Sequence, residues 1–121
     1  MTSTTPVAFV YVAELGRALD FYRGTLGLKV DDTDDYGAML ACDGGLLRLT
    51  VMPDHKPHEH PVFGLHVGDF GKAFEALHGK GVRFTVYEGM TDARGVCKGG
   101  DGKAMAWFAD PDGNALMLSE A

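Results

Sequence analysis

Histidine and carboxylate side chains crowd one short stretch near the middle of the chain. The stretch from Pro53 to Pro61 contains His55, His58, Glu59 and His60. These residue types bind divalent metals, so their clustering suggests a metal site. Their spacing matches no zinc-finger or zincin pattern, however, and the prolines keep the stretch out of a sheet. We therefore interpret residues 53–61 as a solvated linker.

Three other groups of residues could perform chemistry. The carboxylates of Asp31, Asp32, Asp34 and Asp35 could do acid–base work, but an acidic run at a strand end is more often solvated. The run Gly99–Gly102 superficially resembles a phosphate-binding loop, but no Gly-Lys-Ser/Thr follows, which favours a mobile flap or a hairpin turn. Cys42 and Cys97 show no pairing or ligand spacing, so we expect two free thiols in a reducing compartment.

Length and charge limit the class of protein. A chain of 121 residues fits one domain, which can bury a core without a metal or a disulfide. The net charge of −6 and the lack of a basic stripe argue against nucleic acid as a partner, although the acidic field would favour a cationic ligand. No apolar run reaches the roughly 18 residues of a membrane span, and the N-terminus lacks the basic region of a signal peptide. We expect a cytoplasmic protein without membrane contact.

The elements that position these residues form an internal repeat. Near the C-terminus, two apolar runs flank the turn sequence Asp110–Asn114, which predicts a β-hairpin. The turn and strand at Asp43–Leu49 match Asp112–Leu118 at a separation of 69 residues. An earlier match, between Val12–Leu19 and Val67–Phe74, has a separation of 55 residues. The chain is therefore predicted to hold two copies of one β-α-β-β-β module.

Periodicity places the elements of each copy. The first module, about residues 6–52, is predicted to have strands at 7–12, 28–34, 36–42 and 46–52, with a helix at 16–26. The second module, about residues 62–119, is predicted to have a helix at 69–80 and strands at 62–68, 82–87 and on either side of the Asp110–Asn114 turn. Residues 88–103 are predicted to be a glycine-rich loop. The fold class is α+β, in one domain spanning residues 1–121.

Two motifs resemble a known family. The first runs from Val12 to Leu28 as Val-x-Glu-Leu-x-Arg-Ala-x-x-Phe-Tyr-x-x-x-Leu-Gly-Leu, and the second runs from Trp107 to Asn114 as Trp-Phe-x-Asp-Pro-Asp-Gly-Asn. With the repeat, they resemble the vicinal oxygen chelate superfamily of glyoxalases, bleomycin-resistance proteins and extradiol dioxygenases. The resemblance implies paired modules whose mixed sheets curl into a cup. It also implies a homodimer, because family members commonly pair modules across two chains and open sheet edges need cover.

The resemblance further implies where metal ligands would lie. Metal-dependent members place a His or Glu on the first and last strand of each module, and these positions are occupied here by Val7, Arg48, Val62 and Met117. Valine has no lone pair, methionine sulfur prefers soft copper, and arginine is already cationic. We therefore expect no metal cofactor. A different strand register leaves a divalent metal open as the alternative, with His60 and His66 as its ligands.

Alternation along the strands then predicts the lining of the cup. If Val7 and Val62 face inward, the predicted ligand-binding side chains are Phe9, Tyr11, Arg48, His66, Met105, Trp107 and Met117, with Ser119 beside them. This lining is aromatic and soft, which suits a small molecule. The simpler alternative is that Met105, Trp107 and Met117 fill the space as core. Arg48 requires a carboxylate, a carbonyl or a ligand anion, because an unpaired inward arginine is costly.

Three functions remain open at this point. The favoured one is a metal-free binding protein of the bleomycin-resistance type that sequesters an aromatic or planar compound, with antibiotic resistance as one possible use. The second is an enzyme, either a metal-dependent lyase or dioxygenase or a metal-free isomerase that uses His66 or Tyr11 as acid–base. The third is a structural or regulatory subunit with a filled cup. Nothing in the sequence distinguishes an antibiotic from a metabolite as ligand.

Overall fold

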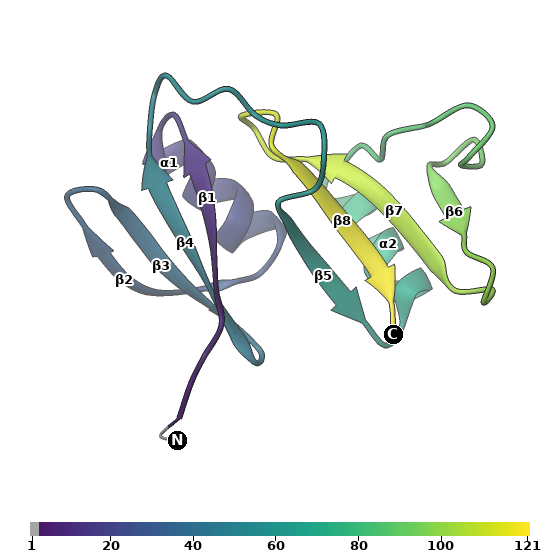
Figure 1. Ribbon diagram of the computed structural model, residues 1–121, viewed down its shortest axis with the longest axis horizontal. Helices are drawn as coiled ribbons and strands as arrows, with labels where there is room; N and C mark the ends of the chain where they lie inside the picture. Colours follow the sequence, from purple (N-terminus) through teal and green to yellow (C-terminus); the bar gives the residue numbers. More distant parts are fainter. Residues whose placement is uncertain (1–2) are drawn as a thin grey trace. The chain divides into compact units, whose positions relative to one another are not determined.

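The computed structural model describes residues 3–121, which divide into two compact units. The first unit ends at Pro57 and the second begins at His58. Each unit has one four-stranded mixed sheet and helical structure on one face of that sheet (Figure 1). The first unit runs β1 (Val7–Val12), α1 (Leu15–Leu19), the π-helical η1 (Asp20–Thr25), β2 (Lys29–Asp34), β3 (Gly37–Cys42) and β4 (Gly45–Val51). The second runs β5 (Phe63–Val67), α2 (Phe70–Gly79), β6 (Val96–Lys98), β7 (Ala104–Ala109) and β8 (Ala115–Glu120). The predicted α+β class with two β-α-β-β-β modules is confirmed.

Strand pairing confirms the internal repeat at the level of single residues. The strand orders β1-β4-β3-β2 and β5-β8-β7-β6 are equivalent, with a parallel first pair in each sheet. Phe9 lies opposite Arg48 in the first sheet, and Gly64 lies opposite Met117 in the second. These two pairs are related by the same separations of 55 and 69 residues that the sequence shows. Arg48 and Met117 therefore occupy equivalent places, as predicted.

Each sheet buries one face under its own helix and leaves the other face open. Val10 and Val12 of β1 are buried, whereas Phe9 and Tyr11 between them are 66 % and 40 % exposed. Leu116 and Leu118 of β8 alternate in the same way with half-buried Met117. This is the period of two expected for a strand with one face in the core. Helix α1 packs on β4, and α2 packs on β8.

An acidic residue caps the start of each α-helix. The carboxylate of Glu14 accepts hydrogen bonds from the backbone N–H groups of Gly16 and Arg17 at 2.9 and 2.8 Å, and these bonds lower the pKa of Glu14. Asp69 caps α2 in the same way through the N–H of Lys72. The predicted helix 16–26 has the right extent, but its second half is a π-helix. Its wider turn brings the N–H of Leu26 within 2.9 Å of the Phe21 carbonyl oxygen.

One predicted strand is wrong. Residues 82–87, all of them described, form no strand, and the edge of the sheet is taken instead by β6, which lies inside the predicted loop 88–103. The alternation of Val82 and Phe84 is real because both are buried, but it reflects packing on α2 rather than a hydrogen-bonded ladder. The run Gly99–Gly102 is a hairpin turn between β6 and β7, closed by the Gly99 N–H and the Lys103 carbonyl oxygen at 2.9 Å.

Candidate functional site

The open face of the first sheet carries aromatic side chains around one arginine. Phe9 lies beside Arg48 across the β1–β4 pair, and Met39 of β3 lies on the other side of Arg48. The ring of Tyr11 meets the ring of His55 edge-on, with the centroids 5.1 Å apart. This face therefore brings together three of the predicted ligand-binding residues, namely Phe9, Tyr11 and Arg48.

Arg48 has a protein partner that the sequence analysis did not assign. Its Nη2 donates to Asp34 Oδ1 at 2.9 Å, and the two side chains are 17 % and 46 % exposed. The same carboxylate oxygen accepts the N–H groups of Tyr36 and Gly37. Hydrogen bonding from Arg48 is the main reason that the pKa of Asp34 falls from 3.8 to about 2. Asp34 and Asp32 alternate along β2, and this spacing was the signal that one of them could face Arg48.

This ion pair predicts a dependence of stability on acid. A carboxyl with a lowered pKa in the folded state stabilises the fold above its unfolded pKa near 3.8, and that contribution is lost as the pH falls through about 2. We expect the urea midpoint of the native protein to drop more steeply between pH 4 and pH 2 than that of Asp34→Asn. Denaturation curves at several pH values measure the difference. Parallel pH profiles for the two proteins would show that the pair contributes nothing.

The open face of the second sheet carries the remaining predicted residues in two rows. One row runs from Gly64 through Met117 to Trp107, and the other runs from His66 through Ser119 to Met105. His66 Nδ1 lies 2.8 Å from Ser119 Oγ. Met117 borders an open pocket of about 290 Å³, which is also lined by Pro61, Val62, Phe63 and Gly64.

The positions of family metal ligands are equivalent in the two units but hold no usual set of ligands. In the first unit, Val7 lies two residues before Phe9, which pairs with Arg48. In the second unit, Val62 lies two residues before Gly64, which pairs with Met117. Within residues 3–121, no three His, Cys, Asp or Glu side chains come close enough together to hold a metal ion. The alternative ligand His60 lies outside the strand that carries His66, because β5 begins at Phe63. The ring of His60 stacks on that of His58 with the centroids 5.0 Å apart.

A further aromatic residue joins the second open face without having been predicted. The ring of Tyr87 meets that of Trp107 at 89°, with the centroids 5.6 Å apart. In the predicted strand 82–87, alternation with the buried Val82 and Phe84 places Tyr87 on the opposite face, and this was the signal that could have found it. The face therefore combines Trp107, Met117, Met105 and Tyr87 with the polar side chains of His66 and Ser119.

Comparison with known proteins identifies the class. The family model described as the Glyoxalase/Bleomycin resistance protein/Dioxygenase superfamily matches residues 5–118, and the chain belongs to that superfamily. A comparison with curated proteins finds no match. No helix within residues 3–121 is long and apolar enough to cross a membrane.

Solved structures of the superfamily share the fold. A superfamily member from Sphaerobacter thermophilus is 24 % identical with a TM-score of 0.73, and the match covers 98 % of both chains. A member from Alicyclobacillus acidocaldarius is 20 % identical with a TM-score of 0.77, covering 99 % of this chain and 94 % of the other. A lactoylglutathione lyase from Agrobacterium tumefaciens is 16 % identical with a TM-score of 0.76, covering 98 % and 94 %. At these identities the likeness concerns the fold and not the activity.

Proposed function

We propose that the chain is a small-molecule binding protein of the bleomycin-resistance type, which sequesters an aromatic or planar ligand without a metal ion. Gly64 and Met117 carry this proposal, because they border an open pocket whose other lining residues are Pro61, Val62 and Phe63. Trp107 lies opposite Met117 on the same face of the sheet. The volume of about 290 Å³ is close to the lower end of small-molecule pockets, at roughly 300 Å³. A homodimer remains part of the proposal.

The first open face supports a preference for anions. Arg48 uses one nitrogen for Asp34, and a guanidinium has further N–H donors with which it can bind a carboxylate or phenolate oxygen. A ligand anion would compete with Asp34 for this charge. Phe9 and Tyr11, on the same face, offer rings to the planar part of a ligand.

Binding of two naphthalene probes tests the proposal. We use 2-naphthoate as the anionic probe and 2-acetylnaphthalene as the neutral one, with calorimetry in the presence of EDTA. Arg48→Met is expected to weaken 2-naphthoate by roughly tenfold to a hundredfold and to leave the neutral probe nearly unchanged, because a charge-assisted bond contributes about 1.5–3 kcal/mol. Trp107→Leu, on the second open face, is expected to weaken the neutral probe by about tenfold, because it removes the aromatic ring.

Asp34→Asn is the matched control for the role of Arg48. It removes the competing carboxylate and is expected to strengthen binding of 2-naphthoate. If neither probe binds the native protein in EDTA, the binding function without a metal is wrong. If Arg48→Met lowers only the melting temperature, Arg48 is a structural partner of Asp34 and not an anchor for ligands.

A further inference from the structure

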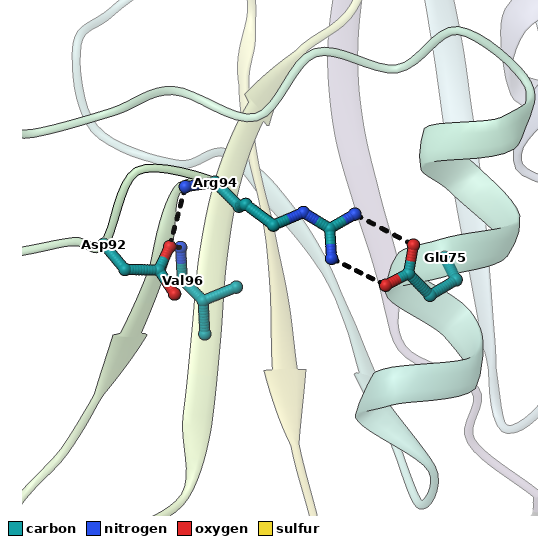
Figure 2. Close-up of polar contacts among 4 residues, drawn as sticks. All are labelled: Glu75, Asp92, Arg94 and Val96. Carbon is teal, nitrogen blue, oxygen red and sulfur yellow. Dashed lines mark hydrogen bonds and ion pairs between the residues drawn. The ribbon is translucent and has the colours of Figure 1, made fainter.

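The segment between α2 and β6 is tied to the helix by one arginine. Arg94 Nη1 donates to Glu75 Oε2 at 2.7 Å and Arg94 Nη2 donates to Glu75 Oε1 at 2.9 Å, which is a bidentate pair (Figure 2). The guanidinium carbon also lies 5.0 Å from the centre of the Phe74 ring, within the range of a cation–π contact. These contacts fix the side chain of Arg94 on two neighbouring residues of α2.

The backbone around Arg94 forms a tight turn. Asp92 Oδ1 accepts the N–H groups of Arg94 at 2.8 Å and Val96 at 3.0 Å (Figure 2). Gly95 has a φ of 93°, and a Cβ at this position would come within 2.9 Å of the Phe84 Cβ and the Thr85 carbonyl oxygen. The turn is therefore packed against Phe84 and Thr85, which lie earlier in the same segment.

The other end of the segment lies on the open face of the sheet. The Tyr87 N–H donates to Thr91 Oγ1 at 2.9 Å, and the Thr91 N–H donates to the Tyr87 carbonyl oxygen at 2.9 Å. The Thr85 N–H donates to the carbonyl oxygen of Trp107 at 2.8 Å. This backbone bond ties the segment to β7 two residues before Tyr87. The rings of Tyr87 and Trp107 meet at 89°.

We propose that Tyr87 contacts the ligand directly, and that the Arg94–Glu75 pair positions it. The proposal rests on the binding function proposed above and assigns the ligand class as flat aromatic ring systems. Two perpendicular rings form a corner, in which a flat ring that stacks on one of them meets the other edge-on. Both geometries are favourable for aromatic pairs, whereas a saturated ring of the same size gains from neither. The exposed side chains of Val86 and Met90 lie on the same segment.

Tyr87→Ala tests the contact with the ligand. We expect it to weaken 2-acetylnaphthalene, the neutral probe, by about threefold to tenfold and to leave 2-acetyldecahydronaphthalene, a saturated probe of similar size, nearly unchanged. Tyr36→Ala, which removes an exposed tyrosine from the first unit, is the matched control and should change neither affinity. Equal losses for the flat and the saturated probe, or no loss for either, would overturn the aromatic corner.

Arg94→Met tests the positioning role, with Arg83→Met on the same segment as its control. Because Arg94 and Glu75 are 51 % and 59 % exposed, their loss should leave the protein folded. Arg94→Met is expected to weaken 2-acetylnaphthalene by about threefold in the native background and to have no effect in Tyr87→Ala, because a residue that acts through Tyr87 has no effect once Tyr87 is removed. Equal effects in both backgrounds would refute that role.

A measurement without ligand separates this inference from the proposed function. Trp107 is the single tryptophan of the chain, so its fluorescence reports on the corner alone. Arg94→Met and Tyr87→Ala are both expected to raise the quenching of Trp107 by acrylamide, whereas Arg83→Met should not. If quenching rises but the native protein binds no naphthalene probe, Arg94 positions Tyr87, but the proposed binding function and the proposed contact of Tyr87 with the ligand are wrong. If binding occurs but quenching is unchanged in Arg94→Met, positioning by Arg94 is wrong.

Discussion

Gly37→Ala is expected to destabilise the protein by about 3 kcal/mol or more, through a clash between main-chain groups. A Cβ at Gly37 would lie 1.8 Å from the carbonyl oxygen of Leu49 and 2.8 Å from its carbonyl carbon. Gly37 pairs with Thr50 in the β3–β4 ladder, so relief of the clash requires these two strands to separate. A flexible side chain could move aside, but a backbone carbonyl inside a sheet cannot move without loss of hydrogen bonds.

Urea denaturation followed by circular dichroism measures this effect. Gly24→Ala is the matched control, because among the described residues nothing lies within 4 Å of a Cβ at that position. Alanine is also a better helix former than glycine, so Gly24→Ala should be neutral or slightly stabilising. If Gly37→Ala behaves like Gly24→Ala, the close approach of the two strands is not a property of the folded protein.

The sequence predicts those features of the fold that depend on local chemistry. Alternation of Val10 and Val12 with Phe9 and Tyr11 identified the core face and the open face, because a strand has a period of two. The predicted helices 16–26 and 69–80 start next to Glu14 and Asp69, whose carboxylates satisfy the free N–H groups at the helix starts. These signals are contained within a few consecutive residues.

Pairings between distant residues could not be predicted in the same way. Asp34 is one of several carboxylates near the end of β2. The register of β2, β3 and β4 makes it the partner of Arg48. Val82 and Phe84 alternate like strand residues, yet hydrogen bonding in the folded sheet gives the edge to β6 instead. The contacts of Tyr87 with Trp107 and of Arg94 with Glu75 depend on the path of the segment between α2 and β6. Tertiary context overrides local pattern at each of these places.

The turn between β7 and β8 is expected to be the most sensitive polar site of the second unit. Asp110 and Asn114 are 5 % and 2 % exposed. Asp110 Oδ1 accepts the N–H groups of Asp112 at 2.9 Å and Asn114 at 2.8 Å, and Asp110 Oδ2 accepts from Asn114 Nδ2 at 2.8 Å. The first unit has Ala41 and Gly45 at the equivalent positions, so this network belongs to the second copy alone.

Asp110→Ala should therefore cost about 3 kcal/mol of stability, because it leaves buried donors without their acceptor. The matched control is Asp43→Ala in the exposed turn of the first unit, which should change stability little. Because β7 and β8 carry Trp107 and Met117, loss of the turn should also alter the fluorescence of Trp107 in the folded baseline. Equal urea midpoints for Asp110→Ala and Asp43→Ala would show that the buried carboxylate does not hold the hairpin together.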